Sequence, residues 1–292
     1  MRKAAATGSA ARKGMDFHRV YTNAAAASTT QPPANTARMR TGVCGIAVII
    51  ASAFSGGFAS PLFAKDPPPD LARRAAHRET ETDAERSHYT YTQSVRLQEL
   101  DRRGIQAGEY HEVREIIFSP AGERTERFSG APVMNLKNLI MTDEDFSDIR
   151  EIQPFVMTED RLFIYETHYK GEEPCLLTEP GGRNCWVLSI RPRQILSGQR
   201  LFDGLLWIAE DDFSVIRSEG KAVPEIVTTK KENLFPHFST VRRLVNGFWF
   251  PSMTTADDTL YFRSLPIREK LLIRYDGYKK FGADTTVTFE KN

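Results

Sequence analysis

Apolar and polar residues alternate along most of the chain from Tyr89 onward, and this alternation predicts short strands. In "YTYTQSVRLQEL" (89–100) the odd-numbered residues from Tyr89 to Leu97 share one face. Segments 109–119 and 123–130 follow across turns that contain glycine. Parallel strands would need long crossovers, so these three strands are expected to form an antiparallel meander.

Strands with the same alternation resume at Arg161 and continue almost to the end of the chain. "VNGF" (245–248) is an Asn-Gly hairpin signal, and Asp211-Asp212 marks another turn. About ten strands are too many for a flat sheet of this size, so a mainly β fold (α+β) with a strongly curled antiparallel sheet is expected. The later strands are predicted at 161–171, 184–194, 201–210, 213–222, 236–247, 248–259 and 268–281.

A helical insert at about 133–153 interrupts this pattern. Apolar residues recur at helical spacing within 136–140 and again within 146–152. Thr142, followed by three acidic residues, is a typical helix N-cap, and Pro154 ends the segment. The insert is expected to lie across the concave face of the sheet, because both must bury an apolar side.

The segment "GLLWIAE" (204–210) is apolar on both faces, which predicts a central strand. One face is expected to meet the insert or a cavity, and the other the preceding linker helix or solvent. Large aromatic residues would supply apolar area either as plain core or as the lining of a cavity. These aromatics are Trp186, Trp207, Phe248, Trp249 and Phe250.

The N-terminal region has the composition of a leader rather than of a folded domain. Residues 1–38 are rich in Ala and Thr, and are interpreted as disordered or as the product of a start codon assigned upstream of Met39. Residues 39–64 run from a basic start through an apolar stretch to small residues, as a secretory signal peptide does; a membrane anchor is the alternative. A Pro-rich linker and a short helix (65–86) then precede the domain at 87–292.

Charge and cysteine content fit an exported protein. The first 64 residues hold seven of the 39 Lys and Arg and one of the 38 Asp and Glu, which leaves a net charge of about −5 (32 against 37) on the rest. An acidic domain argues against a nucleic-acid partner. Cys175 and Cys185 flank a Pro-Gly-Gly turn signal and predict a disulfide in an oxidising compartment, with two free buried thiols as the alternative.

Motifs for catalysis, metal binding or cofactor binding do not emerge from the sequence. The histidines fit neither a zinc-protease spacing nor a nucleophile elbow, and no Gly-rich phosphate loop precedes a helix. Glu166 and His168 share a strand face, which suits acid–base work but is more typical of a solvated edge. The acids at 210–212 lack Ca²⁺-loop spacing and are interpreted as a solvated turn. The chain is therefore expected to be no enzyme and to need no cofactor or metal.

The second half of the domain resembles the LolA-like outer-membrane lipoprotein-sorting proteins, in their exported, uncharacterised branch. The resemblance covers roughly 185–281 and consists of four short motifs in a fixed order. They are a Gly-x-x-Trp-Ile strand (Gly204, Trp207, Ile208), a V-x-R-x-x-G strand (Val215, Arg217, Gly220), a G-x-W-F-P segment (Gly247, Trp249, Phe250, Pro251) and a late Y-x-x-Y strand (Tyr275, Tyr278).

This resemblance implies an incomplete antiparallel barrel in which a helical lid, here Leu136–Ile152, covers an apolar cavity. It implies a periplasmic or secreted carrier of an acyl chain, a lipid or a lipidated protein, with peripheral contact to the membrane. An envelope-assembly module with a closed core and a protein partner is the alternative, and a hydrolase a distant third. The residues expected to contact the ligand are Leu97, Ile117, Leu139, Phe146, Val187, Trp207, Phe248 and Phe250.

Overall fold

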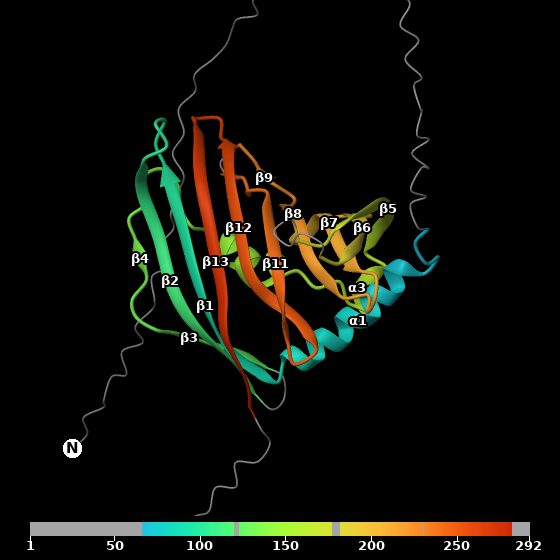
Figure 1. Cartoon of the computed structure of the whole chain (residues 1–292). Helices are drawn as coiled ribbons and strands as arrows, with labels where there is room; N and C mark the ends of the chain where they lie inside the picture. Colours follow the sequence, from blue (N-terminus) through green and yellow to red (C-terminus); the bar gives the residue numbers. More distant parts are fainter. Residues whose placement is uncertain (1–65, 120–122, 177–181, 230, 282–292) are drawn as a thin grey trace, which may run out of the picture.

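The computed structural model describes residues 66–119, 123–176, 182–229 and 231–281, and this part of the chain is mainly β (Figure 1). The expected signal peptide and the residues before it lie outside the described residues. The strands of the main sheet are β1 (Tyr89–Leu100), β2 (Gln106–Phe118), β3 (Arg124–Phe128), β4 (Val133–Met134), β5 (Tyr165–Pro174), β6 (Asn184–Pro192), β7 (Leu201–Ala209), β8 (Val215–Val223), β11 (Phe238–Val245), β12 (Phe248–Tyr261) and β13 (Pro266–Lys280); β9 (Ile226–Val227) and β10 (Glu232–Asn233) pair separately.

The main sheet is antiparallel throughout, as predicted, and has the strand order β3-β2-β1-β13-β12-β11-β8-β7-β6-β5, with β4 paired to β2. The first strand therefore pairs with the last, β1 with β13, at the middle of the longer half of the sheet. Figure 1 shows the long strands β1, β2, β12 and β13 side by side, with the shorter strands β5–β8 at the other end. The end strands β3 and β5 do not pair with each other, so the sheet is open.

The main hydrophobic core lies on one face of this sheet and is closed by helices. Successive side chains of a strand point to opposite faces, so Phe202, Leu206 and Ile208 of β7 enter this core together. The helical residues that contribute to it include Ala75 and Ile149. The helices are α1 (Leu71–Arg86), α2 (Asp143–Ser147), the π-helix η1 (Asp148–Ile152) and α3 (Glu159–Leu162).

The predicted short helix before the sheet is confirmed as α1, but its position is different from the expected one. Arg242 of β11 donates hydrogen bonds to Glu79 of α1 at 2.7 and 3.0 Å, and also to the carbonyl oxygen of Phe155, which follows the insert, at 2.6 Å. The helix and the insert therefore lie on the same face of the sheet. The other face of the central strand was expected to meet this helix or solvent. The apolar side of α1 joins the main core instead, and Trp207 on the other face is buried in the cluster beside the disulfide.

The first predicted helical run of the insert, 136–140, is also wrong, because this segment is an irregular loop. The buried carboxylate of Glu99 accepts the backbone N–H groups of Lys137 and Asn138 at 2.9 Å each, and that of Leu139 at 3.2 Å. Backbone donors held by a side chain are withdrawn from helical pairing. The spacing of apolar residues in this segment reflects the burial of Leu139 and not a helix.

The predicted hairpin turn at 245–248 is confirmed. Asn246 and Gly247 have φ angles of 49° and 86°, the paired positive values that a type I′ turn requires. This turn sets the pairing of Val245 with Phe248 and so the start of the β11–β12 register.

Cys175 and Cys185 form the predicted disulfide, with Cα atoms 5.0 Å apart. It joins the end of β5 to the start of β6, next to the buried side chains of Val187 and Trp207. The double substitution Cys175→Ser/Cys185→Ser is expected to lower the free energy of unfolding by about 2–3 kcal/mol, because the bond restricts the unfolded chain. Urea unfolding of both proteins measures the difference, and equal midpoints would contradict it.

Candidate functional site

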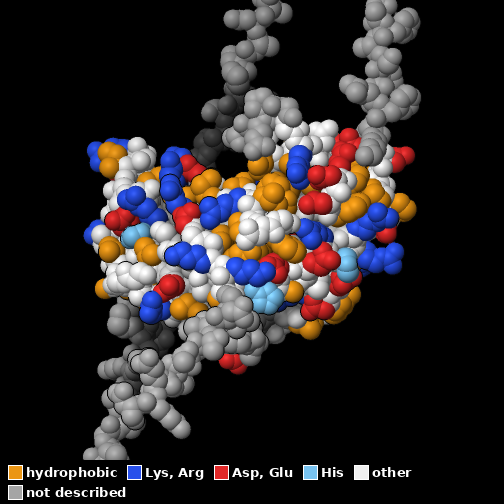
Figure 2. Space-filling view, turned by 60° about the horizontal axis from the view of Figure 1, so that its bottom comes forward, with side chains coloured by type: hydrophobic (Ala, Val, Ile, Leu, Met, Phe, Trp, Pro, Cys, Tyr) orange, Lys and Arg blue, Asp and Glu red, His pale blue; other side chains and the backbone are white. Residues whose placement is uncertain are grey.

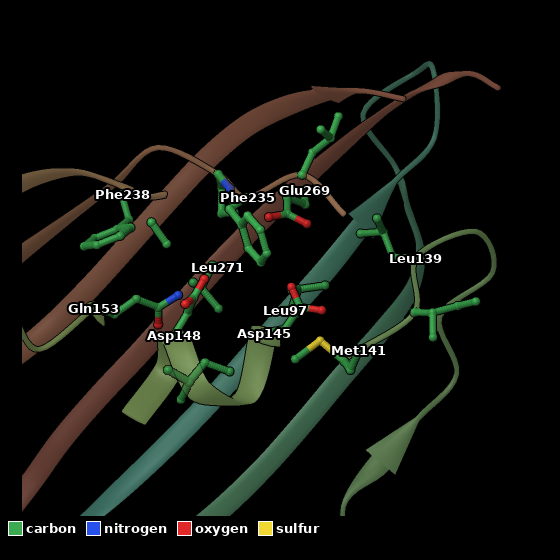
Figure 3. A pocket seen from close by; sticks show the side chains of 15 residues that line it. Leu97, Leu139, Met141, Asp145, Asp148, Gln153, Phe235, Phe238, Glu269 and Leu271 are labelled. Carbon is green, nitrogen blue, oxygen red and sulfur yellow. The ribbon is translucent and has the colours of Figure 1, made fainter. Parts of the chain in front are cut away.

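The candidate site is an apolar pocket between the insert and the sheet (Figure 3). Leu97 of β1 and Leu271 of β13 contribute its floor, while Leu139, Met141 and Ile149 come from the loop and the insert above them. Phe235 and Phe238, before and at the start of β11, close its side (Figure 3). The cavity has a volume of about 30 Å³, space for one or two water-sized groups.

The helical part of the insert begins at a capping box. The Thr142 side chain accepts the backbone N–H of Asp145, and the Asp145 carboxylate accepts the backbone N–H of Thr142 at 2.7 Å. The predicted N-cap is therefore confirmed. Three acidic residues in the first turn lie where the helix dipole favours negative charge. A π-helical turn follows directly, and π-helical turns are often found at functional sites.

Polar contacts hold the insert to the sheet in addition to its apolar side chains. The amide of Gln93 on β1 donates to the carbonyl oxygen of Ile149 at 3.4 Å. The Thr240 hydroxyl on β11 donates to the carbonyl oxygen of Gln153 at 2.6 Å. These contacts bind backbone carbonyls at the end of η1, where an α-helical ladder no longer uses them.

A buried ion pair joins η1 to the segment before β7. Arg200 donates to the carboxylate of Asp148 from two nitrogens, one of them 3.1 Å from the acceptor oxygen, and only 3% of the Asp148 side chain is exposed. The Arg200 guanidinium also lies 3.8 Å from the centre of the Phe235 ring, at the pocket wall. Burial raises the pKa of Asp148 to about 6, although Arg200 acts in the opposite direction. This carboxylate is thus held in an environment that penalises its charge.

Two facing glycines explain how the end of the insert is seated. Gly204 of β7 and Gly220 of β8 are paired across the strands, and the Phe202 ring occupies the space where a Cβ atom on either one would lie. The Phe155 ring stacks on Phe202, with centroids 4.7 Å apart and planes 19° from parallel. The glycines of both strand motifs therefore make room for the aromatic stack that holds the insert.

Two of the eight predicted ligand-contacting residues, Leu97 and Leu139, line the pocket. Phe146 lies on the other side of α2, in an open cleft where its ring contacts Tyr110 edge-on at 5.8 Å. Phe248 lies beside α1, under Arg78. Phe250 is fully buried between Tyr89 and Tyr278.

The remaining three predicted contact residues do not enter the main core. Ile117 alternates with the core residue Ile116 and so points to the opposite face of the sheet. Val187 and Trp207 are cross-strand neighbours in the small cluster beside the disulfide. Trp207 donates to Glu173 at 2.9 Å and stacks under Arg217 at 3.6 Å.

Several pocket residues were not anticipated from the sequence. Phe235, Phe238 and Leu271 line the pocket, as do the polar side chains of Asp148 and Gln153. Phe235 lies in the connection between β8 and β11, where periodicity gives no signal. Phe238 lies in the predicted strand 236–247, but the sequence did not indicate that it meets the insert. Leu271 lies in the predicted strand 268–281, but its neighbour Leu272 is also apolar, so the sequence did not indicate which of the two faces the core.

Outside the pocket, the surface has mixed charge. In the face shown in Figure 2, basic, acidic and hydrophobic side chains are interspersed. Within the described residues, no group of three or more His, Cys, Asp or Glu side chains is arranged to hold a metal ion. None of the described helices has the length and apolar character needed to cross a membrane.

The chain matches no protein-family model and no curated protein. Similar solved structures include a DUF1329 family protein from Desulfovibrio piger, with 12% identity, a TM-score of 0.39 and coverage of 77% of this chain and 96% of that one. A domain from Vibrio parahaemolyticus named for outer membrane lipoprotein sorting has 8% identity, a TM-score of 0.30 and coverage of 72% and 92%. The MucA/MucB complex of Pseudomonas aeruginosa has 13% identity, a TM-score of 0.21 and coverage of 71% and 94%.

The similar structures thus include a domain of the kind that the sequence resembles. At these identities and TM-scores the likeness transfers no ligand and no partner to this chain. The function is therefore inferred from the geometry of the pocket.

Proposed function

We propose that this protein is an exported, non-catalytic carrier that binds an acyl chain, a lipid or a lipidated protein between the sheet and the insert. The sheet would act as an incomplete barrel, with the insert as its lid. The supporting observation is that the pocket has a largely apolar lining contributed by both the sheet and the insert. Moving the insert would therefore open an apolar surface on both sides of the same space.

In this proposal the described structure is the closed state. A cavity of about 30 Å³ cannot hold a long acyl chain, so the chain enters only when the insert moves away. Burial of a chain contributes roughly 0.8 kcal/mol per methylene, or about 10 kcal/mol for a long chain before the costs of ordering. That gain displaces the insert provided that the closed state is only marginally favoured, despite the hydrogen bonds that Glu99, Arg200 and Thr240 make to it.

Export is supported by the disulfide between Cys175 and Cys185. Disulfides persist in oxidising compartments and are rare in the cytosol. The periplasm, or the medium after secretion, is therefore the proposed location, which is also where a carrier of envelope lipids would work.

A second candidate function is favoured by the small volume of the cavity. If the core stays closed, the protein is an envelope-assembly module, and the open edge of β5 is the part that would pair with a strand of a protein partner. The two functions differ in whether the interior ever accepts a guest.

Binding of an uncharged fluorescent acyl probe to delipidated protein tests the carrier. We expect saturable binding of the probe, and lipid detectable by mass spectrometry in protein that has not been delipidated. The substitution Ala222→Phe places a ring in the pocket from β8, so it should lower the affinity for the probe at least tenfold. Trp207→Ala is the matched control, because Trp207 lies in the cluster beside the disulfide: stability should fall while probe affinity stays unchanged. Protein that is always empty and binds no probe would support the closed module instead.

A further inference from the structure

A row of buried polar side chains crosses the sheet beneath the insert. Its members come from the adjacent strands β1, β13, β12 and β11, and each is at most 1% exposed: Gln93, Tyr275, Thr254 and Thr240. Gln93 pairs directly with Tyr275 across the strands, and Thr254 pairs with Thr240. Burying a polar side chain in an apolar core costs free energy unless it is hydrogen-bonded, so the row needs partners among its own members, on the insert or on a guest.

The hydroxyl groups of this row all donate in one direction, toward the insert. Thr240 donates its single hydrogen to the carbonyl oxygen of Gln153 at 2.6 Å, so Thr254 is the donor in its 2.7 Å contact with Thr240. Thr254 then has no hydrogen left, and Tyr275 donates to it at 3.3 Å. Burial raises the pKa of Tyr275, so its hydroxyl keeps the proton that it donates. The row therefore ends at Thr240 in a donor, which requires an acceptor.

Gln93 is a second donor to the insert, at the other end of the row. Its amide donates to the carbonyl oxygen of Ile149 at 3.4 Å. In a π-helix the N–H group five residues later would donate to this oxygen, but that residue is Pro154, which has no N–H. Ile149 and Gln153 both line the pocket, so the two sheet donors bind the backbone of residues that would have to move to admit a guest.

We infer that Gln93 and Thr240 determine the specificity of the carrier, because they donate to carbonyl oxygens of the guest once the insert has moved away. This inference rests on the proposed carrier function. In the closed state the backbone carbonyls of Ile149 and Gln153 accept these hydrogen bonds. In the open state the ester or amide carbonyls of an acylated guest take their place.

The energetic reason for this specificity is the cost of an unpaired donor. A guest without carbonyl groups would cover both donors with hydrocarbon and leave them without an acceptor, which costs free energy. The ligand class is therefore an acyl ester or amide, and an alkyl ether with the same chains binds more weakly.

Displacement of a bound fluorescent acyl probe by 1,2-dioctanoylglycerol and by its ether analogue, 1,2-di-O-octylglycerol, tests the inference. The two compounds have chains of equal length and the same free hydroxyl group, and they differ in two carbonyl groups. One hydrogen bond contributes about fivefold in affinity, so we expect the ester to bind roughly 20-fold more tightly than the ether.

Variants of the two donors assign this difference to them. Thr240→Val keeps the shape of the side chain and removes its hydroxyl group, so it should lower the ester's advantage about fivefold, as should Gln93→Leu. Thr255→Val is the matched control, because it removes a hydroxyl group from an exposed position of β12 on the opposite face of the sheet and should leave the advantage unchanged. Thr240→Val also weakens the hold on the insert, but this change affects both compounds equally. The ratio of the two affinities therefore reports recognition of the carbonyl.

The outcomes separate this inference from the function on which it rests. A ratio near one in the native protein would overturn the inference and leave the carrier intact, and this measurement needs no variant. Equal ratios in the native protein and Thr240→Val would show that Thr240 only seats the insert. If the probe binds but neither glycerolipid displaces it, the inferred ligand class is wrong. If the probe itself does not bind, the carrier fails and the inference fails with it.

Discussion

Arg242→Ala is expected to lower the free energy of unfolding by about 3–5 kcal/mol, the largest stability effect of any single change considered for this protein. The side chains of Arg242 and Glu79 are 2% and 1% exposed, and Arg242 also binds the carbonyl oxygen of Phe155. Its removal leaves a buried carboxylate without a cation and frees both α1 and the end of the insert. Urea unfolding followed by circular dichroism measures the loss.

The matched control for this prediction is an exposed ion pair of the same type. Arg268 binds Asp257 on the surface, with both side chains more than 40% exposed, so Arg268→Ala should change the free energy of unfolding very little. The double variant Glu79→Leu/Arg242→Met should recover much of the lost stability, because apolar side chains need no compensating charge. A small effect of Arg242→Ala would show that the pair does not anchor α1.

Asp148→Asn is expected to change how stability depends on pH. The folded pKa of Asp148 is raised to about 6, above its ordinary value of 3.8, so its contribution to stability is fully present below pH 3.8 and is lost as pH rises through 6. That loss is on the order of 2–3 kcal/mol. Asparagine cannot ionise, so the variant should gain stability relative to the native protein between pH 4 and 7. Unfolding free energies measured across this range give the result.

Asp257→Asn provides a control with the opposite sign. Hydrogen bonding by Arg268 lowers the pKa of Asp257, so its stabilising contribution is lost as pH falls. Asp257→Asn should therefore be less stable than the native protein at neutral pH but not at low pH. Asp148→Asn should become more stable than the native protein as the pH rises. Parallel pH profiles for the native protein and Asp148→Asn would show that burial does not penalise this carboxylate.

The strands were predictable because they are determined locally. Alternation gave the bounds of β1 without error, and β6, β7, β12 and β13 to within a few residues. The hairpin at Asn246-Gly247 and the disulfide were also predictable, since a turn needs particular backbone angles and a disulfide needs only two cysteines near each other. The N-cap at Thr142 belongs to the same class, because a cap involves residues three apart.

The sequence could not predict which face of the sheet each apolar side chain occupies, or which distant residues bind the backbone of the insert. The side chains at 206 and 207 are equally apolar in the sequence, yet Leu206 enters the main core and Trp207 packs beside the disulfide. The loop at 136–140 has helical spacing, but the carboxylate of Glu99, some forty residues earlier in the chain, takes its backbone donors. Neither outcome leaves a local signal.

By itself, the sequence determined that this protein is an antiparallel sheet with a short insert, a hairpin turn and a disulfide, because each follows from neighbours along the chain. Only the tertiary structure decided where the pocket lies and what lines it. Leu97, Asp148, Phe235 and Leu271 come from separate segments and meet through the pairing of β1 with β13 and the docking of η1 on the sheet. Segments that are equally apolar in sequence become buried or exposed according to which distant segments pack against them. This packing also brings acidic side chains into the pocket lining.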